Sequence, residues 1–241
     1  MAENKILLID DDKHLAEIAS RQLEELGYVI THVQDGQTGL SRALEGEFQL
    51  VVVDLGLPLL GGMEVCRRLR TQRPAQPILV LTGQSDETSS VLALELGADE
   101  FITKPIKPLE FKARVRALMR RAELTTTASN PRPQNTATQS ILNYRDITIN
   151  DERRSVLVDS QPVELTALEY DLLKIFVLNL GRTLSKEDIV GQLWGDSAYS
   201  YSENVRTIVS RLRIKLEAVG KRPPYIITQR GFGYRSATED E

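Results

Sequence analysis

The chain has 241 residues, is 41% hydrophobic and 27% charged, and carries a formal net charge of −4 at pH 7, which suits one large or two ordinary soluble domains. No apolar run approaches the ~20 residues of a membrane span and the N-terminus has no signal-peptide layout, so we expect a cytoplasmic protein without a membrane segment. The single cysteine, Cys66, excludes an internal disulfide, and two histidines are too few to favour a histidine-based metal site.

Residues 1–122 alternate short apolar runs with amphipathic segments. Apolar runs of this length, bounded by turn residues, are typical of strands buried on both faces, and apolar residues three and four positions apart are typical of helices. Strands are expected at 6–9, 28–33, 49–54, 77–83 and 100–103, and helices at 15–26, 36–44, 61–71, 87–96 and 109–121. The alternation predicts an α/β domain with a doubly wound five-stranded parallel sheet, in which all strands have their carboxyl ends on one edge.

A polar segment, residues 123–140, follows this domain and contains two prolines but no bulky apolar residue after Leu124. We expect a flexible linker there. Beyond it, short antiparallel strands are expected at 146–149, 155–158 and 163–165, helices beginning near residues 166, 185 and 203, and a closing hairpin over 225–235. This order predicts an α+β winged helix-turn-helix domain over 141–237, followed by an acidic tail at 238–241.

Asp54 ends one of the apolar runs, and turn-forming Gly56 and Pro58 follow it. An isolated aspartate in such a place often does no more than cap a turn. In open α/β sheets, however, ligands bind beyond the carboxyl ends of the strands. Other strands of the predicted sheet end there in chemically matched side chains, namely Asp10, Asp11, Thr82 and Lys104. Carboxylates suit a hard cation such as Mg²⁺, and the lysine and hydroxyl suit a transferring phosphoryl group, so the set predicts a phosphoryl-accepting site.

Positive charge is concentrated near the C-terminus. Residues 206–235 hold eight basic side chains and one acid, a net charge of +7, so the rest of the chain carries −11. This segregation predicts a nucleic-acid-binding face, with the helix 203–219 in the major groove of duplex DNA and the hairpin in the adjacent minor groove. The alternative is a basic helix that is merely solvated. The helix positions that could face bases or phosphates are Arg206, Thr207, Ser210, Arg211 and Arg213.

Distinctive motifs are spread over nearly the whole chain. They are IDDD (9–12), DLGLP (54–58) with Gly61, LTG (81–83), GADEFITKP (97–105), LTALE (165–169), SRLR (210–213) and RGFGYR (230–235). With these motifs, residues 1–121 resemble the receiver domain of two-component response regulators, and residues 141–235 resemble the DNA-binding domain of the OmpR/PhoB family. The resemblance implies a flavodoxin-like receiver followed by a winged-helix domain.

The resemblance also implies roles for the residues at the sheet edge. Asp54 would take a phosphoryl group from a phosphohistidine on a sensor histidine kinase. Asp11, Asp54 and the carbonyl of Gly56 would bind Mg²⁺ directly, and Asp10 would act mainly through water.

Three further positions near the same edge have implied roles. Thr82 and Lys104 would bind the phosphoryl oxygens, and the bond between Lys104 and Pro105 would be cis. Phe101 would take the aromatic switch position, where tyrosine is commoner. A phenylalanine can swing as tyrosine does, but it cannot form a hydrogen bond in either orientation.

The family's active form is a homodimer of phosphorylated receivers. By resemblance, Asp99 and Arg114 would pair across its interface, and Glu110 would supply a second acid. Ser90 stands where the family usually has a base, which weakens the ionic part of this prediction, and the alternative is that these charges are only solvated.

On the DNA side, the resemblance makes Arg230 the minor-groove arginine of the hairpin and implies double-stranded promoter sites arranged as direct repeats. Arg206 stands where relatives often have an acid, so the target sequence cannot be inferred from them. The family contacts RNA polymerase around Trp194 and the loop after it, although Trp194 itself is better explained as a core residue.

These observations predict a phosphorylation-controlled transcriptional regulator and not an enzyme, with slow autodephosphorylation at most. A phosphatase with an aspartyl nucleophile would need a second aspartate two positions after Asp54, where this chain has Gly56. DNA binding that is independent of phosphate is the third reading, and the complete set of acids, threonine and lysine disfavours it.

Overall fold

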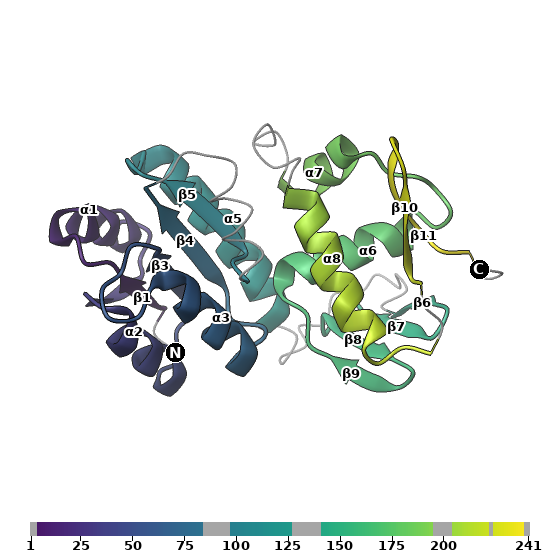
Figure 1. Ribbon diagram of the computed structural model, residues 1–241, viewed down its shortest axis with the longest axis horizontal. Helices are drawn as coiled ribbons and strands as arrows, with labels where there is room; N and C mark the ends of the chain where they lie inside the picture. Colours follow the sequence, from purple (N-terminus) through teal and green to yellow (C-terminus); the bar gives the residue numbers. More distant parts are fainter. Residues whose placement is uncertain (1–3, 84–96, 127–140, 195–203, 222–223, 239–241) are drawn as a thin grey trace. The chain divides into compact units, whose positions relative to one another are not determined.

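The structure, a computed structural model, describes residues 4–83, 97–126, 141–194, 204–221 and 224–238. The chain divides into two compact units, Met1–Ala122 and Glu123–Glu241, and each is described by itself (Figure 1). Within the described ranges, no helix is both long enough and apolar enough to cross a membrane.

The first unit is built on a parallel five-stranded sheet in the order β2-β1-β3-β4-β5, which confirms the expected α/β fold. Its elements are β1 (Lys5–Ile9), α1 (Lys13–Glu24), β2 (Val29–Val33), α2 (Gly36–Glu45), β3 (Leu50–Asp54), α3 (Gly62–Gln72), β4 (Ile78–Thr82), β5 (Glu100–Thr103) and α5 (Pro108–Thr126). The helix expected at 87–96 lies outside the described residues. Helix α5 continues past its expected end at Arg121 to Thr126, within the segment predicted as a linker.

Each face of this sheet has its own core, because alternate residues of a strand point to opposite sides. On one face, Ile6 packs in a cluster with Leu23 of α1 and Phe111 of α5, and all three side chains are fully buried. On the other face, Ile9 lies against α2 at Gly39, where an added Cβ would come within 2.5 Å of the Ile9 Cδ1 atom. Burial on both faces explains why these strands are almost continuous apolar runs.

The second unit joins an antiparallel sheet in the order β6-β7-β8-β9 to a set of helices and a hairpin, β10-β11. Its described elements are β6 (Ile141–Tyr144), β7 (Ile147–Asn150), β8 (Ser155–Val158), β9 (Gln161–Val163), α6 (Ala167–Leu178), α7 (Lys186–Trp194), α8 (Asn204–Glu217), β10 (Ile226–Gln229) and β11 (Gly233–Ser236). This is the winged-helix architecture expected from the sequence.

Helix α6 begins at the capping box that the sequence indicates. The Thr166 hydroxyl accepts the Glu169 N–H at 3.3 Å, and the Glu169 carboxylate accepts the Thr166 N–H at 2.9 Å. Two backbone donors that a helix start would leave unpaired are therefore satisfied.

The small sheet differs from the expectation at its two edges. Strand β6 (Ile141–Tyr144) is not among the expected strands, and only its Tyr144 is buried, so the apolar alternation that reveals a strand is missing. The expected strand at 163–165 lies instead at Gln161–Val163. Pro162 lacks an N–H and is tolerated there because β9 is an edge strand.

Candidate functional site

A cluster of carboxylates lies at the carboxyl edge of the parallel sheet. Asp10 follows β1 and Asp54 ends β3, and both are buried, with 0% and 5% of their surface exposed. Asp11 is exposed beside them. One ligand oxygen from each of the three carboxylates lies within 4.8 Å of the others, which is close enough to hold one cation.

Lys104 bridges two of these acids. Its Nζ atom lies 3.1 Å from Asp10 Oδ2 and 3.0 Å from Asp54 Oδ1. Its backbone N–H donates to the carbonyl of Thr82 at 2.7 Å, and its bond to Pro105 is cis, as the resemblance implied. The Lys104 ammonium group therefore lies between the carboxylates of Asp10 and Asp54.

The charges of the site alter its protonation equilibria. Burial alone would lower the pKa of Lys104, but hydrogen bonds and charge from Asp54 and Asp10 outweigh it and raise that pKa. Burial raises the pKa of Asp10, and the Asp12 N–H and the Lys104 charge offset this only in part. The lysine therefore stays charged beside two carboxylates.

Thr82 and Phe101 lie on the strands next to Asp54. In the sheet register Asp54 pairs with Leu81, so Thr82 is one position further toward the edge, and it is 2% exposed. Phe101 pairs with Val80 and is 7% exposed, so its ring is turned into the protein. The structure thus brings the threonine to the acid cluster and holds the aromatic side chain inward.

The backbone after Asp54 is packed against it through two glycines. A Cβ on Gly62 would lie 1.9 Å from the carbonyl oxygen of Asp54, and a Cβ on Gly56 would lie 3.2 Å from Asp54 Oδ2. Between them, Leu59 has a φ of 65° and is 87% exposed. Gly62 was not among the predicted site residues, although the Gly61-Gly62 pair directly after the turn was a usable signal.

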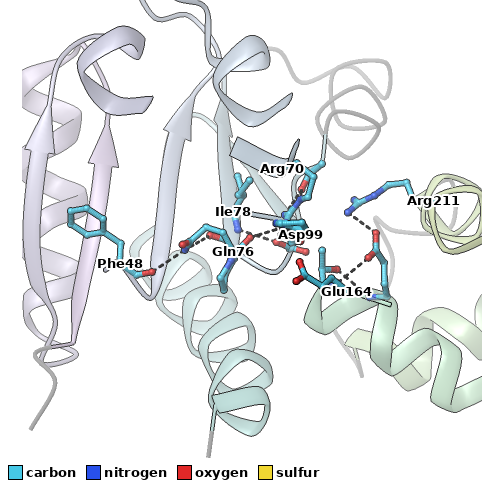
Figure 2. Close-up of polar contacts among 12 residues, drawn as sticks. Phe48, Arg70, Gln76, Ile78, Asp99, Glu164 and Arg211 are labelled. Atoms are coloured by element: carbon cyan, nitrogen blue, oxygen red, sulfur yellow. Dashed lines mark hydrogen bonds and ion pairs between the residues drawn. The ribbon is translucent and has the colours of Figure 1, made fainter. Parts of the chain in front are cut away.

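In the second unit, the candidate DNA-contacting residues of α8 fall into two groups. Arg206 and Ser210 are exposed, as is Arg230 in the hairpin turn, whereas Thr207 is only 6% exposed. Arg211 Nη2 lies 2.8 Å from the Oε1 atom of the fully buried Glu169, an ion pair drawn in Figure 2. The structure therefore presents only part of the predicted set to solvent.

Arg213 also has partners within its own unit. Its Nε donates to the carbonyl of Ile226 at 3.0 Å and its Nη2 donates to Thr228 Oγ1 at 2.9 Å. Its guanidinium lies 5.9 Å from the centre of the Tyr234 ring. The sequence shows that position 213 places a positive charge on a helix. It does not show the partners of that charge, because all three belong to the hairpin.

Comparison with known proteins assigns the two units. Residues 6–116 match the model of the response regulator receiver domain, and residues 160–236 match the model of the C-terminal domain of transcriptional regulatory proteins. The chain is 35% identical over 234 residues to the alkaline phosphatase synthesis transcriptional regulatory protein PhoP of Bacillus subtilis (strain 168), covering 96% of this chain and 95% of that protein. The chain is a response regulator of the OmpR/PhoB family.

Other relatives agree with this assignment. The response regulator is 36% identical over 230 residues to Protein RcaC of Microchaete diplosiphon, covering 95% of this chain but 34% of that longer protein. Among solved structures, a mutant of RitR has a TM-score of 0.71 at 26% identity, covering 97% of this chain and 99% of the other. A receiver domain and a DNA-binding domain make this protein a transcriptional regulator.

The residues predicted at the response regulator's dimer interface have partners within the single chain. Asp99 is 2% exposed, and its Oδ2 accepts from Arg70 Nη2 at 2.8 Å and from the Ile78 N–H at 2.9 Å (Figure 2). Arg114 Nη2 lies 2.7 Å from Glu110 Oε1. None of these three contacts joins Asp99 to Arg114, whose pairing between two copies remains a prediction.

Proposed function

We propose that this response regulator accepts a phosphoryl group on Asp54 from a sensor histidine kinase in the cytoplasm, and that phosphorylation promotes receiver pairing and promoter binding. One observation carries the proposal: Lys104 Nζ lies 3.0 Å from Asp54 Oδ1 and 3.1 Å from Asp10 Oδ2 at the ligand-binding edge of the sheet. In this arrangement Asp54 can accept a phosphoryl group, and the positive charge of Lys104 can stabilise the negative charge of that group.

The chain's own residues have separate roles in this transfer. An Asp54 carboxylate oxygen attacks the phosphorus, a new O–P bond forms, and the N–P bond of the phosphohistidine breaks, leaving its electron pair on the imidazole nitrogen. Lys104 binds a phosphoryl oxygen as the negative charge moves toward Asp54, and the Thr82 hydroxyl binds another. Hydrolysis of the acyl phosphate is expected to be slow, because Gly56 stands where a phosphatase would need a second aspartate as acid and base.

The acid cluster fits Mg²⁺, which prefers oxygen ligands. Asp11, Asp54 and the Gly56 carbonyl would hold the ion directly, with Asp10 acting through water. When bound, Mg²⁺ would reduce the repulsion between these carboxylates and the incoming phosphoryl group. The approach of three carboxylate oxygens to within 4.8 Å of one another supports this assignment, because the one positive charge of Lys104 does not balance three acids that lie so close together.

The output of the regulator is DNA binding by the second unit. We propose that α8 enters the major groove with Arg206 and Ser210 facing the DNA, and that Arg230 reaches the minor groove. All three are exposed, in agreement with this role. Two phosphorylated copies would bind direct-repeat promoter sites. A movement of Thr82 toward the phosphoryl group, with the ring of Phe101 buried behind it, would link phosphorylation to pairing. The region after Trp194, which lies outside the described residues, would contact RNA polymerase.

Incubation with Mg²⁺ and a small-molecule phosphodonor is expected to add one phosphoryl group to the protein. Asp54 provides the oxygen nucleophile, so Asp54→Ala should abolish the addition. The measurement is the intact mass of the protein before and after incubation. Asp11→Ala, or chelation of Mg²⁺, should strongly reduce the addition without altering the circular dichroism spectrum.

The same experiment separates the proposal from its alternatives. Equal mass gain in the wild type and in Asp54→Ala would place the acceptor elsewhere. No gain in the wild type, together with unchanged DNA binding, would instead favour a regulator that does not depend on phosphate. Continuous release of inorganic phosphate in excess of the protein would indicate a phosphatase.

Phosphorylation is expected to convert the receiver from monomer to dimer. Arg114 and Glu110 lie on α5, and Arg114 also lies 3.1 Å from the buried Glu100. Both internal contacts of Arg114 must rearrange before its charge can pair with a second copy. Arg114→Ala should therefore weaken the phosphorylated dimer by about fivefold, the effect of one ion pair across the interface. Urea unfolding of the unphosphorylated variant measures separately the effect of removing this partner of the buried Glu100. Arg116→Ala removes an exposed arginine from the same helix and controls for the change in net charge.

Sedimentation velocity of the phosphorylated and unphosphorylated proteins measures this change. The same monomer before and after phosphorylation would contradict the dimer prediction. Equal weakening by the two arginine variants would show that only net charge matters, not the position of Arg114.

A further inference from the structure

One side chain of the recognition helix α8, Arg213, donates hydrogen bonds to the hairpin β10-β11. Arg213 donates from Nε to the Ile226 carbonyl at 3.0 Å and from Nη2 to Thr228 Oγ1 at 2.9 Å, both on β10. Its guanidinium also lies 5.9 Å from the ring centre of Tyr234, on β11. A single arginine of α8 thus contacts both strands of the hairpin.

The hairpin is anchored on a second side by backbone contacts. The Leu184 N–H donates to the Tyr234 carbonyl at 2.8 Å, and the Tyr234 N–H donates to the Leu184 carbonyl at 2.9 Å. Gly233 permits this approach, because it has a φ of +136° and an added Cβ would lie 2.0 Å from the Leu184 oxygen. Ser236 Oγ also donates to the Phe176 carbonyl at 3.3 Å, so the base of the hairpin is held to α6 and Arg213 adds hydrogen bonds to α8.

The residues on either side of this attachment are the exposed DNA-contacting candidates. Arg206 and Ser210 lie toward the N-terminus of α8, and Arg230 lies in the turn of the hairpin. Arg213 is only partly exposed, and two of its nitrogen atoms already donate to the hairpin. Arg213 therefore uses these hydrogen-bond donors within the protein, on the hairpin. The side chains of Arg206 and Arg230 are exposed to solvent.

We propose that Arg213 is a positioning residue, which holds the hairpin so that Arg230 and the exposed face of α8 engage duplex DNA together. The inference rests on the proposed DNA binding and assigns a different role to a residue that sequence alone placed among the DNA contacts. A hairpin held in its bound position loses less conformational freedom when DNA binds, which increases affinity.

The geometry requires arginine and not merely a positive charge. The planar guanidinium directs two N–H groups at two acceptors and can stack on a ring, whereas a lysine ammonium is a compact point charge on a flexible stem. Lysine at position 213 could bind a DNA phosphate about as well as arginine does. It could not reproduce the contacts to Ile226 and Thr228 at once. Arg213→Lys therefore distinguishes positioning from direct contact.

A double-mutant cycle on the full-length chain tests the proposal. The probe is a fluorescent duplex that the wild-type protein enriches from a random-sequence pool, and the Kd is measured for Arg213→Ala, Arg230→Ala and the double variant. Each single change should raise the Kd by a factor of about ten. The double variant should be no weaker than the weaker single variant, because Arg213 acts through Arg230.

Two comparisons complete the design. Arg206→Ala combined with Arg213→Ala should show independent effects that multiply, since Arg206 does not depend on the hairpin. Arg213→Lys should bind as weakly as Arg213→Ala, and hydrogen exchange at the Phe232 N–H, which donates to the Gln229 carbonyl at 2.9 Å, should be faster in both than in the wild type. If Arg213→Ala does not fold, as judged by circular dichroism, Arg213→Lys takes its place in the cycle.

The opposite results overturn the proposal. Arg213→Lys with wild-type affinity, or effects of Arg213→Ala and Arg230→Ala that multiply to about a hundredfold, would make Arg213 a direct DNA contact. Failure of the wild-type chain to enrich any duplex would instead contradict the DNA-binding function itself.

Discussion

Replacing Glu169 with glutamine is expected to lower the free energy of unfolding of the DNA-binding domain by about 3–5 kcal/mol, the usual cost of removing one partner from a buried ion pair. Glu169 is fully buried, its Oε1 lies 2.8 Å from Arg211 Nη2, and its Oε2 lies 2.7 Å from Lys215 Nζ. Glutamine keeps the volume but removes the buried counter-charge that both cations contact. Urea unfolding of the wild type and the variant measures the difference.

The effect of Glu169 should depend on pH. Burial alone would raise its pKa, but the charges of Arg211 and Lys215 outweigh burial and lower that pKa. A carboxyl group whose pKa is lower in the folded state stabilises the protein above its unfolded pKa, and this contribution is lost as the pH falls through the folded value. The wild type should therefore lose stability as the pH falls below the ordinary glutamate value of 4.5, and Glu169→Gln should lose less.

Glu164 provides the control for this prediction. It is an acid that lies close to Glu169 in the sequence but is exposed, so Glu164→Gln should leave unfolding nearly unchanged. If Glu164→Gln and Glu169→Gln unfold at the same urea concentration, the buried ion pairs contribute no net stability.

The parallel sheet and its acid edge were predictable because local pattern and topology act together. Strands buried on both faces must be apolar runs, and right-handed crossovers place their carboxyl ends on one edge. The run Val51–Val53 ending in Asp54, and the sequence leading to Lys104, therefore specify both the strands and their meeting point. The 3.0 Å contact between Lys104 and Asp54 follows from that topology.

The partners of the arginines were not predictable in the same way. An arginine side chain is long and positively charged wherever it lies. The sequence therefore shows the sign of the charge, but it does not show which carbonyl or carboxylate the side chain contacts. Arg211 reaches a carboxylate on α6, and Arg213 reaches the hairpin, each through tertiary contacts between distant segments. Strand β6 was missed for a related reason, since its pairing with β7 and not its own apolar pattern makes it a strand.

Replacing Arg70 with methionine is expected to destabilise the receiver by about 3–5 kcal/mol. The Arg70 side chain is 12% exposed, and its Nη2 lies 2.8 Å from Asp99 Oδ2. It also donates to the backbone carbonyls of Pro74 at 2.6 Å, Gln76 at 2.8 Å and Gly97 at 3.0 Å. Methionine fills part of the space but leaves a buried carboxylate and these carbonyls without this donor.

Arg68 on the same helix is the matched control. It pairs with Glu64 at 2.6 Å, but its side chain is 45% exposed, so Arg68→Met should cost less than about 1 kcal/mol. Adding Asp99→Asn to Arg70→Met should restore part of the lost stability, because the uncompensated buried charge is then removed. Urea unfolding of the unphosphorylated chain measures all four proteins.

The Arg70 variant also tests the interface role of Asp99. If Asp99 serves mainly within its own chain, Arg70→Met lowers the stability of the unphosphorylated monomer and Asp99→Asn has little separate effect on the phosphorylated dimer. If Asp99 also pairs with Arg114 of a second copy, Arg70→Met still lowers the stability of the monomer, but Asp99→Asn should weaken the phosphorylated dimer. The 2% exposure of Asp99 favours the first result, since a carboxylate must leave that environment before it can pair across an interface.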